Sequence, residues 1–143
     1  ADDVAPSVPV GFLAALDALA EERGAEAAAE RFLITVLGEA AWSRLPRLFR
    51  ERSAREWPQI RGDCYALDAY RVRYRELGAV TTPIRLLGGD RSAAYFRPTL
   101  EALAAALPAA TLTIVAGAGH MLHADAPRAF AEAVDALAAA TAG

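Results

Sequence analysis

A histidine with a glycine directly before it follows a segment rich in β-branched residues. The segment Thr111–Val115 favours a buried strand, and the two glycines of Gly117-Ala118-Gly119 allow the backbone to turn directly after it. His120 is therefore expected at the carboxyl end of a strand, where chemistry gathers in open α/β sheets. Because an imidazole exchanges protons near neutral pH, we predict that His120 is a general base rather than a loop histidine bonded to a carbonyl.

An aspartate occupies the corresponding position after an earlier segment. A strand that opens at Thr82-Pro83 is predicted to run into Gly88-Gly89-Asp90. If the two strands are parallel neighbours, Asp90 and His120 lie at the same edge of the sheet. A carboxylate there orients an imidazole and stabilises its protonated form. The alternative for Asp90 is an ordinary turn residue, since glycine and aspartate are common in loops.

Cys64 offers a competing nucleophile. The segment Gly62-Asp63-Cys64-Tyr65-Ala66 has the form of a nucleophile turn with cysteine at its centre. Such a turn must follow a buried strand, whereas residues 55–61 are polar and contain Pro58. Cys64 is therefore predicted to be a small packing residue.

A metal site is a further alternative at the histidine loop. His120, His123 and Asp125 are all possible ligands, but a metal needs three or four that converge. The chain contains two histidines and one cysteine, so we expect neither a metal nor an organic cofactor. His123 is expected to be a solvated or capping histidine, with the lining of a pocket as the alternative.

Apolar residues at helical spacing predict the elements that position these loops. Four helices are predicted before residue 80: through Phe12, Leu16 and Leu19 to Gly24; through Phe32, Val36 and Leu37 to Gly38; through Trp42, Leu45 and Phe49, interrupted by Pro46; and through Leu67, Tyr70, Tyr74 and Leu77 to Gly78. Two more follow the predicted strands: Leu100, Leu103 and Leu107 before Pro108, and Phe130, Val134 and Leu137 after Pro127. A single strand-helix-strand unit leaves the edges and faces of its sheet exposed, so we expect it to need neighbouring strands.

The order of these motifs resembles the C-terminal part of an α/β-hydrolase. Residues 82–90, then Leu107-Pro108 and the segment GAGHMLHADAP, follow the family's order of strand, acid loop, helix, strand, histidine loop and helix. The resemblance implies an α/β fold with parallel strands, in which residues 1–80 form a helical cap region and residues 81–143 the C-terminal part of the core. It also implies a serine hydrolase acting on an ester, lactone or thioester carbonyl, with His120 and Asp90 as catalytic residues.

The nucleophile elbow of that family, a Gly-x-Ser-x-Gly turn, does not occur in these 143 residues. The four serines, Ser7, Ser43, Ser53 and Ser92, all lack the flanking glycines. We therefore expect the chain to be inactive without a nucleophile segment, and to pair with the N-terminal portion of the same hydrolase or with a second copy of itself. A non-catalytic, truncated assembly or interaction module is the alternative, because exposed strands can pair between chains.

Charge and composition exclude several other classes. The formal net charge of −3 opposes binding to nucleic acids or anionic membranes. No apolar run approaches the roughly 20 residues that span a bilayer, and the acidic N-terminus is unlike a signal peptide. With a single cysteine, the composition suits a reducing compartment, so a cytoplasmic protein acting on a small acyl substrate is expected.

Overall fold

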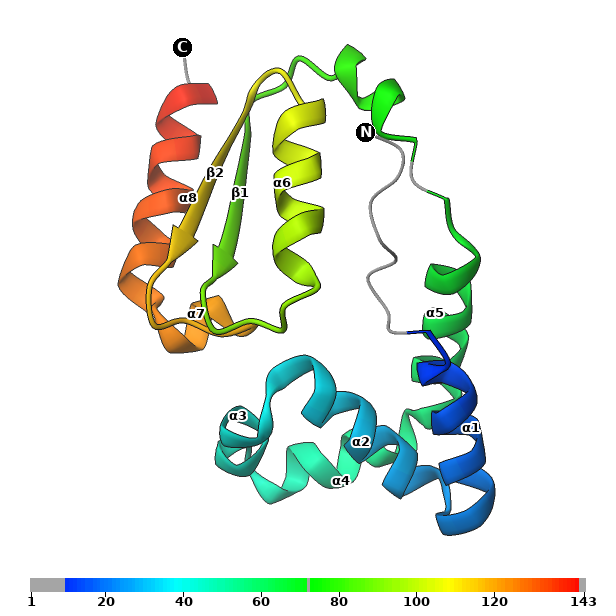
Figure 1. Cartoon of the computed structure of the whole chain (residues 1–143). Helices are drawn as coiled ribbons and strands as arrows, with labels where there is room; N and C mark the ends of the chain where they lie inside the picture. The colour runs from blue at the N-terminus through cyan, green and yellow to red at the C-terminus, as the bar shows by residue number, and fades with distance from the viewer. Residues whose placement is uncertain (1–9, 72, 142–143) are drawn as a thin grey trace. The chain divides into compact units, whose positions relative to one another are not determined.

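The computed structural model describes residues 10–71 and 73–141, which fall into two compact units (Figure 1). The helical unit comprises the described residues of Val8–Arg71. The α/β unit comprises the described residues of Val72–Gly143. Both predicted site residues, Asp90 and His120, belong to the α/β unit.

Five helices form the helical unit. They are α1 (Phe12–Arg23), α2 (Ala25–Leu37), α3 (Glu39–Arg44), α4 (Arg47–Arg55) and α5 (Trp57–Ala69). The first two end at Gly24 and Gly38, as the apolar spacing predicted. The third predicted helix is two helices, because Leu45 and Pro46 both adopt extended backbone between α3 and α4.

The fourth predicted helix is wrong in both its bounds and its continuity. α5 already begins at Trp57, with Pro58 in its first turn, where a missing N–H group costs nothing. It ends at Ala69, because Tyr70 is extended, and Tyr74–Ala79 forms a separate 3-10 helix, η1, in the α/β unit. The apolar stripe that suggested one helix therefore belongs to two elements in different units.

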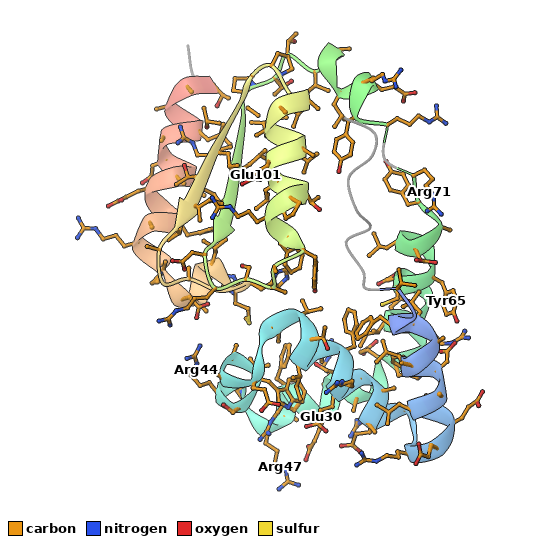
Figure 2. The ribbon with its side chains drawn as sticks, viewed as in Figure 1. Glu30, Arg44, Arg47, Tyr65, Arg71 and Glu101 are labelled. Atoms are coloured by element: carbon orange, nitrogen blue, oxygen red, sulfur yellow. The ribbon has the colours of Figure 1, made fainter. Side chains whose placement is uncertain are left out.

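The core of the helical unit gathers Leu16, Ala28, Ala29 and Trp57. Both alanines are completely buried, and their small side chains allow α2 to approach its neighbours closely. An ion pair adds a second link, since Asp17 of α1 accepts hydrogen bonds from Arg61 Nε at 2.6 Å and from the hydroxyl of Tyr65, both on α5. Figure 2 labels Tyr65. These bonds, that from Arg61 foremost, hold the pKa of Asp17 below its ordinary value.

The α/β unit has the predicted strand-helix-strand order. Its elements after η1 are β1 (Ile84–Gly89), α6 (Phe96–Ala106), β2 (Ala110–Val115), α7 (Leu122–Asp125) and α8 (Pro127–Thr141). The strands are parallel, with Leu86 opposite Leu112 and Gly88 opposite Ile114. Helices α6 and α8 flank the pair in Figure 1. The parallel pairing is confirmed, whereas α7 was not predicted.

The two-stranded sheet is poorly covered. Within Ile84–Gly89 and Ala110–Val115, all of which the structure describes, Gly88 is the one buried residue. Thr111 and Thr113 are exposed, and the other strand residues are half-buried. The Nε atom of Arg85 is buried and finds no hydrogen-bond partner among the described residues. Parallel sheets are normally covered on both faces, and buried polar groups are normally paired.

No helix within residues 10–71 and 73–141 is long and apolar enough to cross a membrane.

Candidate active site

The loops that follow the two strands meet at the carboxyl edge of the sheet. We call residues 90–92 the acid loop and residues 116–121 the histidine loop. The backbone N–H of Asp90 donates to the carbonyl of Val115 at 3.2 Å, and that of Arg91 donates to the carbonyl of Ala118 at 2.9 Å. Ala118 is completely buried. The two predicted catalytic residues therefore lie on loops that are hydrogen bonded to each other.

The side chain of Asp90 also joins the two loops. Its Oδ1 atom accepts a hydrogen bond of 2.7 Å from the backbone N–H of Gly117. Gly117 has a φ of 75°, in the left-handed region that favours glycine. Among the described residues, no hydrogen bond joins Asp90 to His120 directly. In this structure the Asp90 carboxylate thus binds the backbone of Gly117, three residues before His120. That Asp90 orients the imidazole stays a prediction.

Gly89 allows this close approach of the loops. A Cβ atom at Gly89 would lie 2.1 Å from the carbonyl oxygen of Ala118 and 2.6 Å from that of Gly119. Both neighbours are backbone atoms of the histidine loop, so they cannot rotate away as a side chain could. The position before Asp90 therefore requires glycine for a packing reason.

An aromatic ring covers one face of the His120 imidazole. The ring of Phe96, at the start of α6, stacks on it with centroids 4.7 Å apart and an interplanar angle of 23°. His120 is exposed as a whole, but partial burial of its ring, to which Phe96 contributes, lowers the pKa of His120 below its ordinary value. A neutral imidazole is the form that accepts a proton, so this environment favours a base. Sequence reasoning missed Phe96, whose type and spacing are those of an ordinary helix residue.

Removing the Phe96 ring should raise the pKa of His120. In Phe96→Ala, water gains access to the imidazole face, which stabilises the protonated form. The signals of the two histidines in ¹H–¹³C NMR spectra, assigned with a His123→Gln variant, give the titration midpoint of His120 directly. An unchanged or lower midpoint in Phe96→Ala would show that the stacking does not control the protonation of His120.

In the described residues, no hydrogen bond or ring contact joins His123 to His120 or Asp90, and the histidine loop does not form a metal site with its neighbours. His123 is exposed, and its ring makes an edge contact with Phe130 of α8 at 6.4 Å between centroids. Across residues 10–71 and 73–141, no three His, Cys, Asp or Glu side chains gather in a way that could hold a metal ion.

Cys64 lies in a different structural context from a nucleophile turn. The segment from Gly62 to Ala66 is inside α5 rather than between a strand and a helix. Cys64 is buried, with 3% of its surface exposed. Burial, and to a lesser extent the negative charge of Asp63, raises the pKa of its thiol. Both features oppose a reactive thiolate.

The helical unit contains two cavities of its own. One, of about 270 Å³, is lined by residues of α2, α3 and α4, including Glu30 and Arg47, which Figure 2 labels. There Trp42 Nε1 donates a 3.1 Å hydrogen bond to Glu30 Oε1. The other, of about 370 Å³, is bordered by Trp57. Trp42 and Trp57 are both buried, with 7% of their surface exposed, and each borders one of these cavities.

Two parallel strands joined by a helix, with an aspartate loop and a histidine loop at their carboxyl edge, define a protein of the α/β class. A scan against protein-family models matches residues 3–133 to the model described as the alpha/beta hydrolase family. The match spans most of the chain, and the protein belongs to the alpha/beta hydrolase family. Membership indicates hydrolase-type activity. Searches of curated proteins and of solved structures each found no match.

Proposed function

We propose that this chain supplies the base and the acid of a serine hydrolase that acts on an ester, lactone or thioester carbonyl. His120 takes the proton of a serine hydroxyl and passes it to the leaving group, and Asp90 orients the imidazole. The serine belongs to a segment outside these 143 residues. We assign residues 1–80 to the helical cap region of that enzyme, although η1 lies in the α/β unit, and residues 81–143 to the C-terminal part of its core.

The observation that carries this proposal is the joining of the acid and histidine loops at one sheet edge. The 2.7 Å bond from Gly117 N–H to Asp90 Oδ1 engages one carboxylate oxygen. Oδ2 is the second acceptor of that carboxylate, and we assign it to the imidazole N–H in the complete enzyme. The lowered pKa of His120 supports the base role, because the imidazole is then neutral over a wider pH range.

The half-buried strands support a partner. The N-terminal portion of the same hydrolase would supply neighbouring strands, cover the exposed sheet residues and offer an acceptor to Arg85 Nε. A second copy of the chain is the alternative occupant of the sheet edge. The substrate is a small acyl compound, and neither nucleic acid nor membrane is part of the proposal.

The isolated chain should show negligible esterase activity, because a base and an acid do not form an acyl-enzyme without a nucleophile. The test compares hydrolysis of p-nitrophenyl acetate and butyrate by the purified chain and by His120→Ala, with circular dichroism to show that both are folded. Turnover by the chain well above the His120→Ala control would contradict the missing-nucleophile proposal. Loss of such turnover in Cys64→Ser would assign the nucleophile to Cys64.

A further inference from the structure

Asp125 contacts the backbone on both sides of His120. Its Oδ2 atom accepts a 2.9 Å hydrogen bond from the N–H of Gly119, the residue before the histidine. Its own backbone N–H donates a 2.9 Å bond to the carbonyl of Met121, the residue after it. The carboxylate therefore holds the peptide before His120, whereas the bond to Met121 is an ordinary backbone bond of α7.

The Asp125 carboxylate lies close to the Gly119 backbone because Gly119 has no side chain. A Cβ atom built on Gly119 would lie 3.1 Å from Asp125 Oδ2, closer than ordinary van der Waals contact. The carboxylate thus lies directly beside the Gly119 backbone, in space that a side chain would enter. Because only six residues separate the partners, closing this loop costs little chain entropy.

Asp90 holds the same loop at Gly117. The histidine loop is consequently fastened by two carboxylates to alternate N–H groups, one on each side of the buried Ala118. Hydrogen bonds with one ionised partner are stronger than neutral ones. The pair of bonds limits the positions that the His120 backbone can adopt.

We propose that Asp125 is a positioning residue for His120, whose carboxylate holds the imidazole against Phe96 and in line with the reacting atoms through the backbone of Gly119. This inference rests on the proposed function for its catalytic consequence. Its structural part concerns the 143-residue chain alone. Asp125 touches neither the substrate nor the nucleophile in this mechanism.

The experiment compares Asp125→Ala with Asp125→Asn, which keeps an acceptor oxygen, and with Asp135→Ala as a matched control on α8. The readout is the ¹H–¹³C spectrum of the His120 ring, whose protons are shifted by the ring current of Phe96. We expect Asp125→Ala to lose at least half of that shift, whereas Asp125→Asn and Asp135→Ala retain it. His120 signals that are unchanged in Asp125→Ala, or equally disturbed in Asp125→Asn, would overturn the proposal.

A second measurement needs no variant, which covers the case in which Asp125→Ala does not fold. In the unaltered chain, a scalar coupling through the hydrogen bond should join the amide nitrogen of Gly119 to the carboxyl carbon of Asp125. Absence of that coupling would also refute the positioning role. Neither measurement depends on hydrolysis, so the positioning role and the proposed function can fail separately.

The catalytic consequence has its own readout. In an active complex with a serine-bearing segment, Asp125→Ala should lower kcat by roughly tenfold to hundredfold with little change in KM, since small displacements of a reacting group cost about that much. Asp125→Asn should recover most of the rate. An Asp125→Ala complex with normal kcat would refute the catalytic consequence, whereas absence of activity in every complex would refute the proposed function alone.

Discussion

Replacing His120 by alanine should lower kcat of the reconstituted hydrolase by at least about a thousandfold. A positioned general base contributes roughly 10²–10⁴ to the rate, and the members of a nucleophile-base-acid set act as a unit. Reconstitution means mixing the chain with a polypeptide of the alpha/beta hydrolase family that carries the serine elbow. The measurement is kcat for a p-nitrophenyl ester at saturating concentrations of the elbow polypeptide.

Two matched variants separate the base from its surroundings. His123→Ala removes the other histidine of the chain and should change kcat less than about threefold, because its ring contacts Phe130 rather than the loop junction. Asp90→Asn keeps an acceptor for Gly117 N–H but loses the charge that stabilises an imidazolium, and should lower kcat by roughly 10²–10⁴ with the fold intact. Equal activities of the His120→Ala and His123→Ala complexes would remove His120 from the mechanism.

Replacing Gly89 by alanine should destabilise the junction of the acid and histidine loops by about 3 kcal/mol. The new methyl group would overlap the carbonyl oxygens of Ala118 and Gly119, and relief requires movement of backbone. Amide hydrogen exchange in the peptides containing β1 and β2 measures the effect. A loss of 3 kcal/mol corresponds to about a hundredfold fall in protection of the amides that exchange by unfolding.

Two other glycines of the α/β unit, Gly88 and Gly78, serve as controls for Gly89→Ala. In Gly88→Ala the methyl group would meet the ends of the Leu100 and Ile114 side chains, at 2.5 and 3.2 Å, and these can adjust at about 1–2 kcal/mol. In Gly78→Ala it would meet nothing within 4 Å, so protection should stay within about threefold. An order other than Gly89, Gly88, Gly78 in destabilisation would contradict the described loop packing.

The elements that carry the site could be predicted because each has a simple local signal. Thr111–Val115 is rich in β-branched and apolar residues, and Gly117 and Gly119 follow it after Ala116. The parallel pairing followed from the strand-helix-strand order, and the structure confirms it with Gly88 opposite Ile114. These features depend on residues close together in the chain, for which spacing is informative.

The contacts that complete the site depend on tertiary placement, which spacing does not encode. Nothing in the sequence distinguishes Phe96 from a core residue, yet its ring lies on His120 because α6 begins beside the histidine loop. Likewise, Asp90 was predicted to reach the imidazole, whereas its observed partner is Gly117 N–H. The sequence placed the end of the helical region at residue 80, whereas the compact units divide after Arg71. Leu67, Tyr70, Tyr74 and Leu77 keep helical spacing across that division.

The family could be predicted from the order of motifs, and the family-model match confirms it. The nucleophile could not be predicted, because the absence of a serine elbow from these residues does not show which other residue attacks the substrate. The substrate class comes from the resemblance rather than from any residue of the chain. The helical unit adds cavities bordered by Trp42 and Trp57, but their composition does not select an acyl group.

Mixing the chain with an elbow-bearing polypeptide should create esterase activity that neither has alone. The chain, the elbow-bearing polypeptide and their mixture are assayed separately for hydrolysis of a p-nitrophenyl ester, and complex formation is followed by sedimentation. We expect that neither component turns over substrate alone, and that the complex does so with an elbow serine that reacts with a fluorophosphonate. A complex that forms stably but remains inactive, or one in which His120→Ala is as active as the unaltered chain, would contradict it.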